Sequence, residues 1–247
     1  MTVSPVNDPP QILIDPDGFG LLPSGGALGT DEDVPLPLSL FSFEDREMSA
    51  GGGGRLTVSL QCSNGGFAIA SDKTTGDDED AIMGVVWAVG GLAEETGKGP
   101  WPGVVFSGGL VQTNGVLNNL EYVPSPDWHG VDDIIVEASD NGYDGEGGVK
   151  TASFGIQVAV VAVNDAPIVV PAPSRTAVPG EMEELPGFLV LDPDTNTDGR
   201  VSERMLKVSV ECSLGALSFA KGERYGVGFS NGYNASTNTL FFTGLQV

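Results

Sequence analysis

Apolar and polar residues alternate along several short segments of the chain. Leu56, Val58, Leu60 and Cys62 recur at every second position, and this period predicts a strand with one buried face. Complete or shortened versions of the pattern predict further strands in residues 12–14, 34–40, 120–122, 134–138 and 154–160. No segment combines a 3.6-residue period with helix caps, so no helix is predicted. Short strands between clusters of Gly, Pro, Asn and Asp predict an all-β fold, specifically tandem antiparallel Greek-key β-sandwich domains.

Segment 34–40 carries a further signal. Pro35 and Pro37 occupy its outward positions, between the apolar residues Val34, Leu36 and Leu38. Proline has no N–H to donate to a neighbouring strand and is therefore confined to sheet edges. An edge strand is expected here.

An internal repeat runs through the chain. The linker at residues 6–10, Val-Asn-Asp-Pro-Pro, returns at 163–167 as Val-Asn-Asp-Ala-Pro, and segment 56–65 returns at 206–215. Residues 84–87 then match 226–229, and 105–108 match 241–244, so the first copy carries longer loops at about 71–82 and 90–102. The second copy stops at Val247, opposite about Val111 of the first. Three parts are expected: an end strand and linker of a preceding repeat at 1–8, a complete repeat at 9–163, and a second repeat at 164–247 truncated at its C-terminal end.

The charge excludes several functions. The chain has 34 Asp and Glu residues against 11 Lys and Arg, a net charge of -23, so nucleic acid and anionic membrane surfaces are not expected partners. The sequence contains no run of about 18 apolar residues, so membrane insertion within this segment is not expected. Residues 1–10 show no signal-peptide pattern. With one His, no Ser-His-Asp signature and no phosphate-binding loop, no enzymatic activity is expected.

Three groups of acidic and amide residues are predicted to meet at the pole where the chain enters the first repeat. They are Asn7 with Asp8, Glu44 with Asp45, and Asp140 with Asp144 and Glu146. In an immunoglobulin-like sandwich the corresponding loops lie at one end. Clustered carboxylates repel each other unless a cation neutralises them, and all-oxygen ligands favour Ca²⁺.

The second repeat contains the richest acidic loop. Asp194-Thr-Asn196-Thr-Asp198-Gly199 resembles the first half of an EF-hand loop, but Met205 stands where the twelfth position requires Glu. A complete EF-hand is therefore excluded, while a smaller Ca²⁺ site between the repeats is expected. The alternative is that these residues form turns without an ion. The predicted metal ligands are Asp8, Glu32, Asp45, Asp140, Asp144, Asn164, Asp165, Asp192, Asp194, Asn196 and Asp198.

A family resemblance rests on several short motifs in order. The Val-Asn-Asp-Ala-Pro linker, residues 31–33 (Asp-Glu-Asp) before an alternating strand, Tyr122-Val-Pro124 followed by Trp128-His-Gly130, and Ala138-Ser139-Asp140-Asn-Gly142 resemble the cadherin-like tandem repeats of very large surface proteins. Cadherin linkers also carry an Asp two residues before the Asn-Asp pair; Pro5 and Ala162 stand there instead.

The resemblance implies a non-enzymatic extracellular module, a calcium-stiffened spacer with a role in adhesion. Its expected partners are neighbouring repeats of the same chain, with other surface proteins or glycans left open. Its expected location is the cell surface, tethered by a membrane anchor outside this segment. The alternative is a spacer that carries an enzyme or glycan-binding domain elsewhere in the full-length chain.

Three further features are weighed. Cys62 and Cys212 hold equivalent strand positions in different repeats, so buried free thiols are predicted. Trp87 and Trp101 are candidates for stacking on sugar rings in a third hypothesis of glycan binding, although Trp87 aligns with Phe229 and is expected in the core. Asn234-Ala-Ser236 is a glycosylation sequon, relevant only in a secreted eukaryotic protein.

Overall fold

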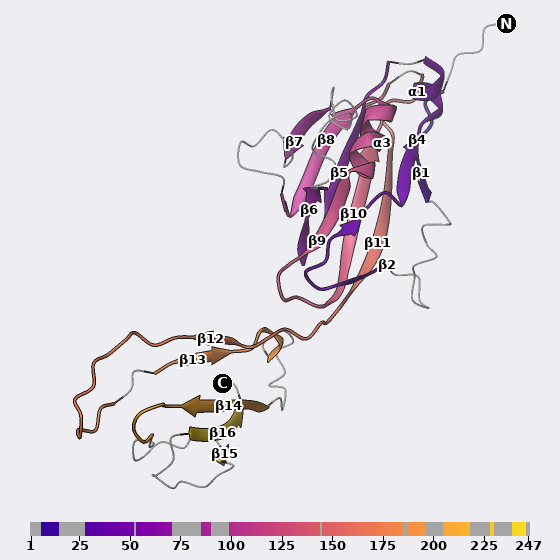
Figure 1. Cartoon of the computed structure of the whole chain (residues 1–247). Coiled ribbons are helices and arrows are strands. Elements are labelled where there is room, and N and C mark those ends of the chain that lie inside the picture. The colour runs from indigo at the N-terminus through magenta and orange to yellow at the C-terminus, as the bar shows by residue number, and fades with distance from the viewer. Residues whose placement is uncertain are drawn as a thin grey trace, which may run out of the picture. The chain divides into compact units, whose positions relative to one another are not determined.

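The chain divides into two compact units, Met1–Val163 (unit 1) and Asn164–Val247 (unit 2), in a computed structural model (Figure 1). The structure describes residues 6–14, 28–51, 53–70, 85–89, 99–143, 145–184, 187–195, 205–217, 228–229 and 239–245. The predicted loops at 71–82 and most of 90–102, together with Asp144, Asn196, Asp198 and the Asn234 sequon, lie outside these residues. In the described part of the chain, no helix is both long and apolar enough to cross a membrane.

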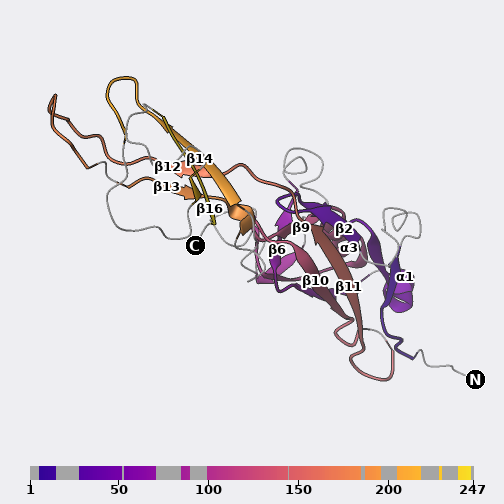
Figure 2. The same cartoon turned by 90° about the horizontal axis from the view of Figure 1, so that it is seen from below.

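A six-stranded sheet forms one layer of unit 1. Its pairings are antiparallel except that β2 runs parallel to β11. The two longest described strands, β10 and β11, lie side by side in both views (Figure 1, Figure 2). Their register joins ten residue pairs. In sheet order the strands are β2 (Leu28–Asp31), β11 (Thr151–Val161), β10 (Gly130–Ser139), β5 (Leu56–Gln61), β8 (Gly103–Gly108) and β7 (Val86–Val89).

Two smaller sheets contain the remaining described strands of unit 1. One has the order β3 (Leu36–Pro37), β9 (Leu120–Pro124), β6 (Gly65–Ile69), and the other pairs β1 (Gln11–Ile14) with β4 (Phe41–Glu44). Inward side chains from all three sheets form a single buried cluster. Burial of this apolar surface is the main favourable term for folding. The all-β class predicted from alternation is confirmed. The largest fully buried side chains are those of Tyr122, Phe43, Phe67 and Phe106.

Strand β3 is shorter than its alternating pattern predicts. Only Leu36 and Pro37 pair with β9, although Leu38 is fully buried. The two prolines remove the donors that a longer ladder needs, and β3 is the edge strand that they predicted.

Two α-helices in the described part of unit 1 were not predicted. They are α1 (Arg46–Gly51) and α3 (Leu110–Asn118). Helix α3 begins after Gly109 without a side-chain cap and contains Gly115, so local signals for it are weak. Tertiary contacts stabilise the helix. The Asn114 side chain accepts a hydrogen bond from the Phe43 N–H at 2.8 Å and donates one to the Phe43 carbonyl at 2.9 Å.

Unit 2 contains two described sheets. β12 (Ile168–Val170) pairs with β13 (Leu189–Leu191), which is followed by a short 3-10 helix at Pro193–Thr195. The second sheet has the order β14 (Met205–Glu211), β16 (Thr239–Leu245), β15 (Gly228–Phe229).

The second sheet of unit 2 repeats part of the large sheet of unit 1 residue by residue. In unit 1, Val58 lies opposite Phe106 on β8; in unit 2, Val208 lies opposite Phe242 on β16. Phe106 is in turn opposite Trp87, as Phe242 is opposite Phe229. These pairs follow the offsets of the sequence alignment, so β14, β16 and β15 correspond to β5, β8 and β7.

Candidate metal centre

The end of unit 1 that holds Asn7, Asp45 and Asp140 is called the entry pole here. Asn7 is 2% exposed, and its amide donates hydrogen bonds to the Asp140 Oδ2 at 2.6 Å and to the Gly148 carbonyl at 2.7 Å. The Asn7 backbone N–H donates to the Glu146 carbonyl at 3.0 Å. The incoming chain is therefore attached to the β10–β11 loop.

Asp140 organises that loop. It is fully buried, and its Oδ1 accepts hydrogen bonds from the N–H groups of Gly142 at 2.7 Å and Lys150 at 2.8 Å. Gly142 has φ of 74°, a left-handed conformation that glycine adopts without a steric penalty. The turn chemistry of Asn141-Gly142 thus places the Asp140 carboxylate next to Asn7.

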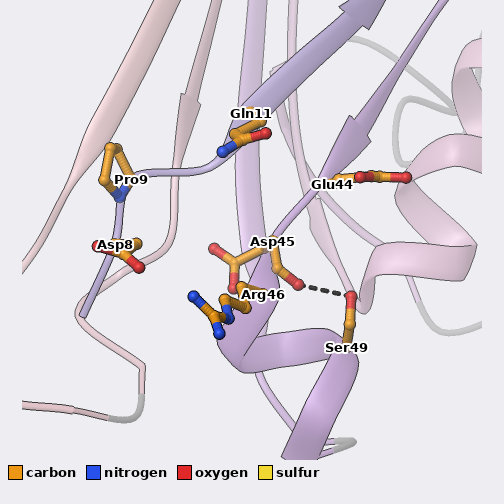
Figure 3. A pocket seen from close by; sticks show the side chains of 7 residues that line it. All are labelled: Asp8, Pro9, Gln11, Glu44, Asp45, Arg46 and Ser49. Atoms are coloured by element: carbon orange, nitrogen blue, oxygen red, sulfur yellow. Dashed lines mark hydrogen bonds between the residues drawn. The ribbon is translucent and has the colours of Figure 1, made fainter. Parts of the chain in front are cut away.

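Asp45 lies between β4 and α1. It is 2% exposed, and its Oδ1 accepts the Met48 N–H at 2.9 Å, which makes it the N-cap of α1. Its backbone carbonyl accepts a hydrogen bond from the Ser49 hydroxyl at 2.6 Å (Figure 3). The cap holds the carboxylate at the mouth of a pocket.

This pocket has a volume of about 580 Å³ and carries mostly negative charge. In Figure 3 the Asp45 carboxylate points toward Asp8, whereas Glu44 points away from both. The exposed Arg46 side chain also lines the pocket and offsets one of the three negative charges. The lining residues are Asp8, Pro9, Gln11, Glu44, Asp45, Arg46 and Ser49.

Three buried oxygen atoms in this region have no hydrogen-bond partner among the described residues. They are Asn7 Oδ1, Asp45 Oδ2 and Glu47 Oε2. Leaving a buried acceptor unsatisfied costs about 1–3 kcal/mol, and more when the group is charged. Carboxylate and amide oxygens are the donors that a hard divalent cation prefers. These oxygen atoms are therefore of the kind that such an ion binds. No three carboxylates of the described entry pole approach one another within 4.8 Å, so part of its coordination would come from amide, backbone or water oxygens.

Glu32 lies at the opposite end of unit 1, called the exit pole. It is 4% exposed, its Oε1 accepts the Val163 N–H at 2.6 Å, and its Oε2 is 3.9 Å from His129 Nδ1. Asp33 and Asp127 each present a carboxylate oxygen within 4.8 Å of the other, and Asp33 also accepts the Asp127 N–H at 3.1 Å. The carboxylates at this pole were only partly anticipated, because nothing in the sequence pointed to Asp127.

Unit 2 has its own group of carboxylates at its beginning. Asp194 Oδ2 accepts the Asp165 N–H at 2.8 Å, and Asp192 Oδ1 accepts the Asp194 N–H at 3.2 Å. Asp165 and Asp194 also offer carboxylate oxygens within 4.8 Å of each other. Asn164 is exposed, and its amide donates to the Asp165 carbonyl at 3.1 Å.

Asp192 corresponds to Asp45 in unit 1. The residue before each closes an equivalent pair of strands: Glu44 lies opposite Gln11, and Leu191 lies opposite Ile168. Each aspartate then precedes a helix, α1 in unit 1 and Pro193–Thr195 in unit 2. The two units thus place a carboxylate at the same point of the fold.

Asn7 was placed among the groups expected to meet at this pole but was left out of the predicted ligands, and Glu47 was not predicted at all. The Asn-Asp pair of both linkers was a usable signal for Asn7, because the repeat retains the amide as well as the acid. Glu47 gave no signal, since it belongs to a helix that the pattern did not predict.

Comparisons of the chain with protein-family models, curated proteins and solved structures found no match. Any functional conclusion therefore rests on the motifs of the sequence and the geometry described above.

Cys62 is half-buried rather than fully buried, and it forms no disulfide. Burial is the main cause that raises the pKa of its thiol from 9.0 to about 12, and the nearby Asp132 carboxylate contributes further. Because the thiolate is the reactive form, we expect Cys62 at pH 8 to react much more slowly with a thiol reagent than the same residue in urea-unfolded chain. The measurement is the rate of labelling at Cys62 by mass spectrometry.

The raised pKa of Cys62 also predicts how the stability of the folded state changes with pH. The folded state holds the Cys62 proton more tightly than the unfolded state, so this stabilisation is complete below about pH 9 and declines as pH rises toward 12. Equal labelling rates in folded and unfolded chain would contradict the expectation.

Proposed function

We propose that the chain is a non-enzymatic extracellular repeat module, built from Greek-key β-sandwich units of the cadherin-like type, that acts as a calcium-stiffened spacer. Its high negative charge keeps a long array of such units soluble and extended. The shared register of β5–β8–β7 and β14–β16–β15 supports the tandem organisation. Adhesion and a cell-surface location follow from the resemblance and belong to the same proposal.

The observation that carries calcium binding is the set of unpartnered buried oxygens at the entry pole. Asn7 Oδ1 and Asp45 Oδ2 belong to side chains that are each 2% exposed. Both side chains use their other polar atom in a hydrogen bond that fixes their orientation. A Ca²⁺ ion would accept the remaining oxygens as ligands and neutralise the adjoining carboxylates.

The linker between the units offers a reason why calcium would stiffen the array. In unit 1, Glu32 binds the Val163 N–H, and in unit 2, Asp194 binds the Asp165 N–H. Two carboxylates thus hold amides of the same short linker. A cation that neutralised these carboxylates would reduce their repulsion of neighbouring acidic groups and so stabilise the end of each unit.

Glycan binding has less support. Trp101 is partly buried, packs against the core of unit 1, and pairs with Phe67 through its backbone. An indole held in this way offers little free surface for stacking on a sugar ring.

Calcium is expected to raise the melting temperature of unit 1. Modules of this kind bind Ca²⁺ with dissociation constants of about 10⁻⁴–10⁻³ M, and at 100-fold excess over that value the gain is about 2.7 kcal/mol. Tryptophan emission reports unit 1 alone, because Trp87, Trp101 and Trp128 all lie in it. Calorimetric titration with Ca²⁺ and with Mg²⁺ measures the binding directly.

Asp45→Asn is the decisive variant. Asparagine retains the oxygen that caps α1 but removes the charge, so the helix is kept and most of the calcium effect is lost. Asp133→Asn makes the same charge change on an exposed outward residue of β10 and should respond to calcium as wild type does. No heat and no melting shift in the wild-type chain at several times ~1 mM Ca²⁺ would rule the proposal out.

A further inference from the structure

One side chain of the entry-pole pocket carries a charge that opposes cation binding. Among the seven described residues that line the pocket, Arg46 alone is basic. Three of the others carry carboxylates, namely Asp8, Glu44 and Asp45. Because like charges repel, a guanidinium in the lining weakens the attraction of the pocket for Ca²⁺.

The place of Arg46 in α1 does not explain its charge. Arg46 is the first residue of the helix and follows the N-cap Asp45. The unpaired N–H groups at a helix start favour a negative side chain, and Glu47 in the same turn agrees with that preference. Arg46 opposes it, so the reason for a cation here lies in the pocket rather than in the helix.

The carboxylates of the pocket supply that reason. In Figure 3 the Arg46 guanidinium extends on the side of the Asp45 carboxylate that faces Asp8. Asp45 is 2% exposed, and its Oδ2 has no hydrogen-bond partner among the described residues. Uncompensated negative charge in a partly enclosed site is unfavourable, and a nearby positive charge reduces the cost. Arg46 therefore serves as a counter-ion when no metal is bound.

Arg46 is held only loosely in this role. The side chain is exposed, and within the described part of the chain no ion pair of 4.0 Å or less joins it to a carboxylate. A bidentate pair with a carboxylate would be strong and difficult to replace. Without such a pair, an entering cation displaces the guanidinium into solvent at little cost.

We propose that Arg46 is a tethered counter-ion that competes with Ca²⁺ for this pocket and thereby sets the calcium affinity of unit 1. The inference rests on the calcium binding proposed above and adds a control of that site. Without metal, the guanidinium offsets part of the charge of Asp8, Glu44 and Asp45. When Ca²⁺ binds, its double charge takes over this function, and Arg46 turns outward.

The competition has two consequences of opposite sign. Removing the positive charge strengthens calcium binding, by about fivefold at low ionic strength. The same change destabilises the calcium-free chain, because the carboxylates lose their counter-ion. At ~1 M salt the Debye length falls to ~3 Å, so the difference in affinity should disappear.

The test uses the full chain, freed of metal by chelation and dialysis, with three variants. Arg46→Gln removes the charge, and Arg46→Lys keeps it. Arg55→Gln makes the same change in net charge at a residue outside the pocket lining. Hydrogen exchange across Arg46–Gly51, titrated with CaCl₂, measures occupation of this pocket.

Arg46→Gln should reach half-saturation at an about fivefold lower calcium concentration than the wild-type chain in low salt, and at an equal concentration in ~1 M KCl. Arg46→Lys and Arg55→Gln should titrate as the wild type does. Without calcium, the melting temperature of unit 1 should be lower in Arg46→Gln than in the wild type. Saturating calcium should bring the two melting temperatures together.

Failure of the competition can be told apart from failure of calcium binding. A wild-type chain that responds to calcium, with an equal or weaker response in Arg46→Gln, would overturn the competition and leave the proposed function in place. An equal gain in Arg55→Gln would assign the effect to net charge and would also overturn it. No response in either the wild type or Arg46→Gln would overturn the proposed function together with this inference.

Discussion

Replacing Asp132 with alanine is expected to destabilise unit 1 by about 3–4 kcal/mol. The residue is 1% exposed, and its two carboxylate oxygens accept four hydrogen bonds. Three donors are the backbone N–H groups of Ser63, Asn64 and Asp133, and the fourth is the buried Tyr122 hydroxyl at 2.9 Å. Removing the carboxylate leaves donors without partners in the interior.

The interaction with Tyr122 has a fixed direction. Burial, followed by the hydrogen bond to Asp132 and its charge, raises the pKa of Tyr122 above the usual value of 10.0. The phenol therefore stays protonated and acts as the donor at all ordinary pH values. It joins β9 to β10, which belong to different sheets, so its loss weakens the attachment between layers.

Urea unfolding followed by tryptophan emission measures the effect, because the emission reports unit 1. Asp133→Ala is the matched control: it removes the neighbouring carboxylate, which is exposed and accepts one hydrogen bond from Gln157 at 3.1 Å. This control should change the free energy of unfolding by no more than about 0.5 kcal/mol. Similar effects of the two substitutions would show that the buried carboxylate is not the structural centre inferred here.

Equivalent leucines of the two units should respond very differently to truncation. Leu56 is fully buried and lies opposite Gly108, and Leu206 is partly exposed and lies opposite Gly244. Leu56→Ala removes contacts that no neighbour can replace, and we expect a loss of about 3 kcal/mol. Leu206→Ala removes a side chain that already contacts solvent, so about 1 kcal/mol is expected.

Hydrogen exchange measures both variants on the same scale, in β5 for the first and in β14 for the second. The chain without substitutions provides the reference rate for each strand. Equal losses would mean that β14 is as well enclosed as β5.

Six strands of unit 1 could be predicted because alternation is a local property of the sequence, whereas β2, β4, β6, β7 and β8 of the same unit were not predicted. Leu56–Gln61 and Thr151–Val161 form strands with the inward residues expected. The parallel pairing of β2 with β11 could not be predicted, because it joins Leu28 to Val158 across most of unit 1. Helix α3 was missed for a related reason: its stability comes from Asn114 bound to β4 rather than from its own residues.

The candidate metal centre could be predicted as a region but not as a set of contacts. The repeated Asn-Asp pair and the acidic turns identified the end of unit 1 at which Asn7 and Asp140 meet. Which oxygen each side chain leaves without a partner depends on the cap at Asp45 and on the turn after Asp140. Those bonds are set by tertiary structure, which spacing alone does not specify.

The attachment of Asn7 to the β10–β11 loop has a mechanical consequence. A pull applied at the two ends of unit 1 enters at Asn7 and leaves at Val163, just beyond the end of β11. The hydrogen bonds from Asn7 to Asp140 and Glu146 transfer that tension directly to the β10–β11 hairpin. The load then runs along β11 to the other pole, parallel to the strands, so the ladders to β10 and β2 are sheared together instead of opening one bond at a time.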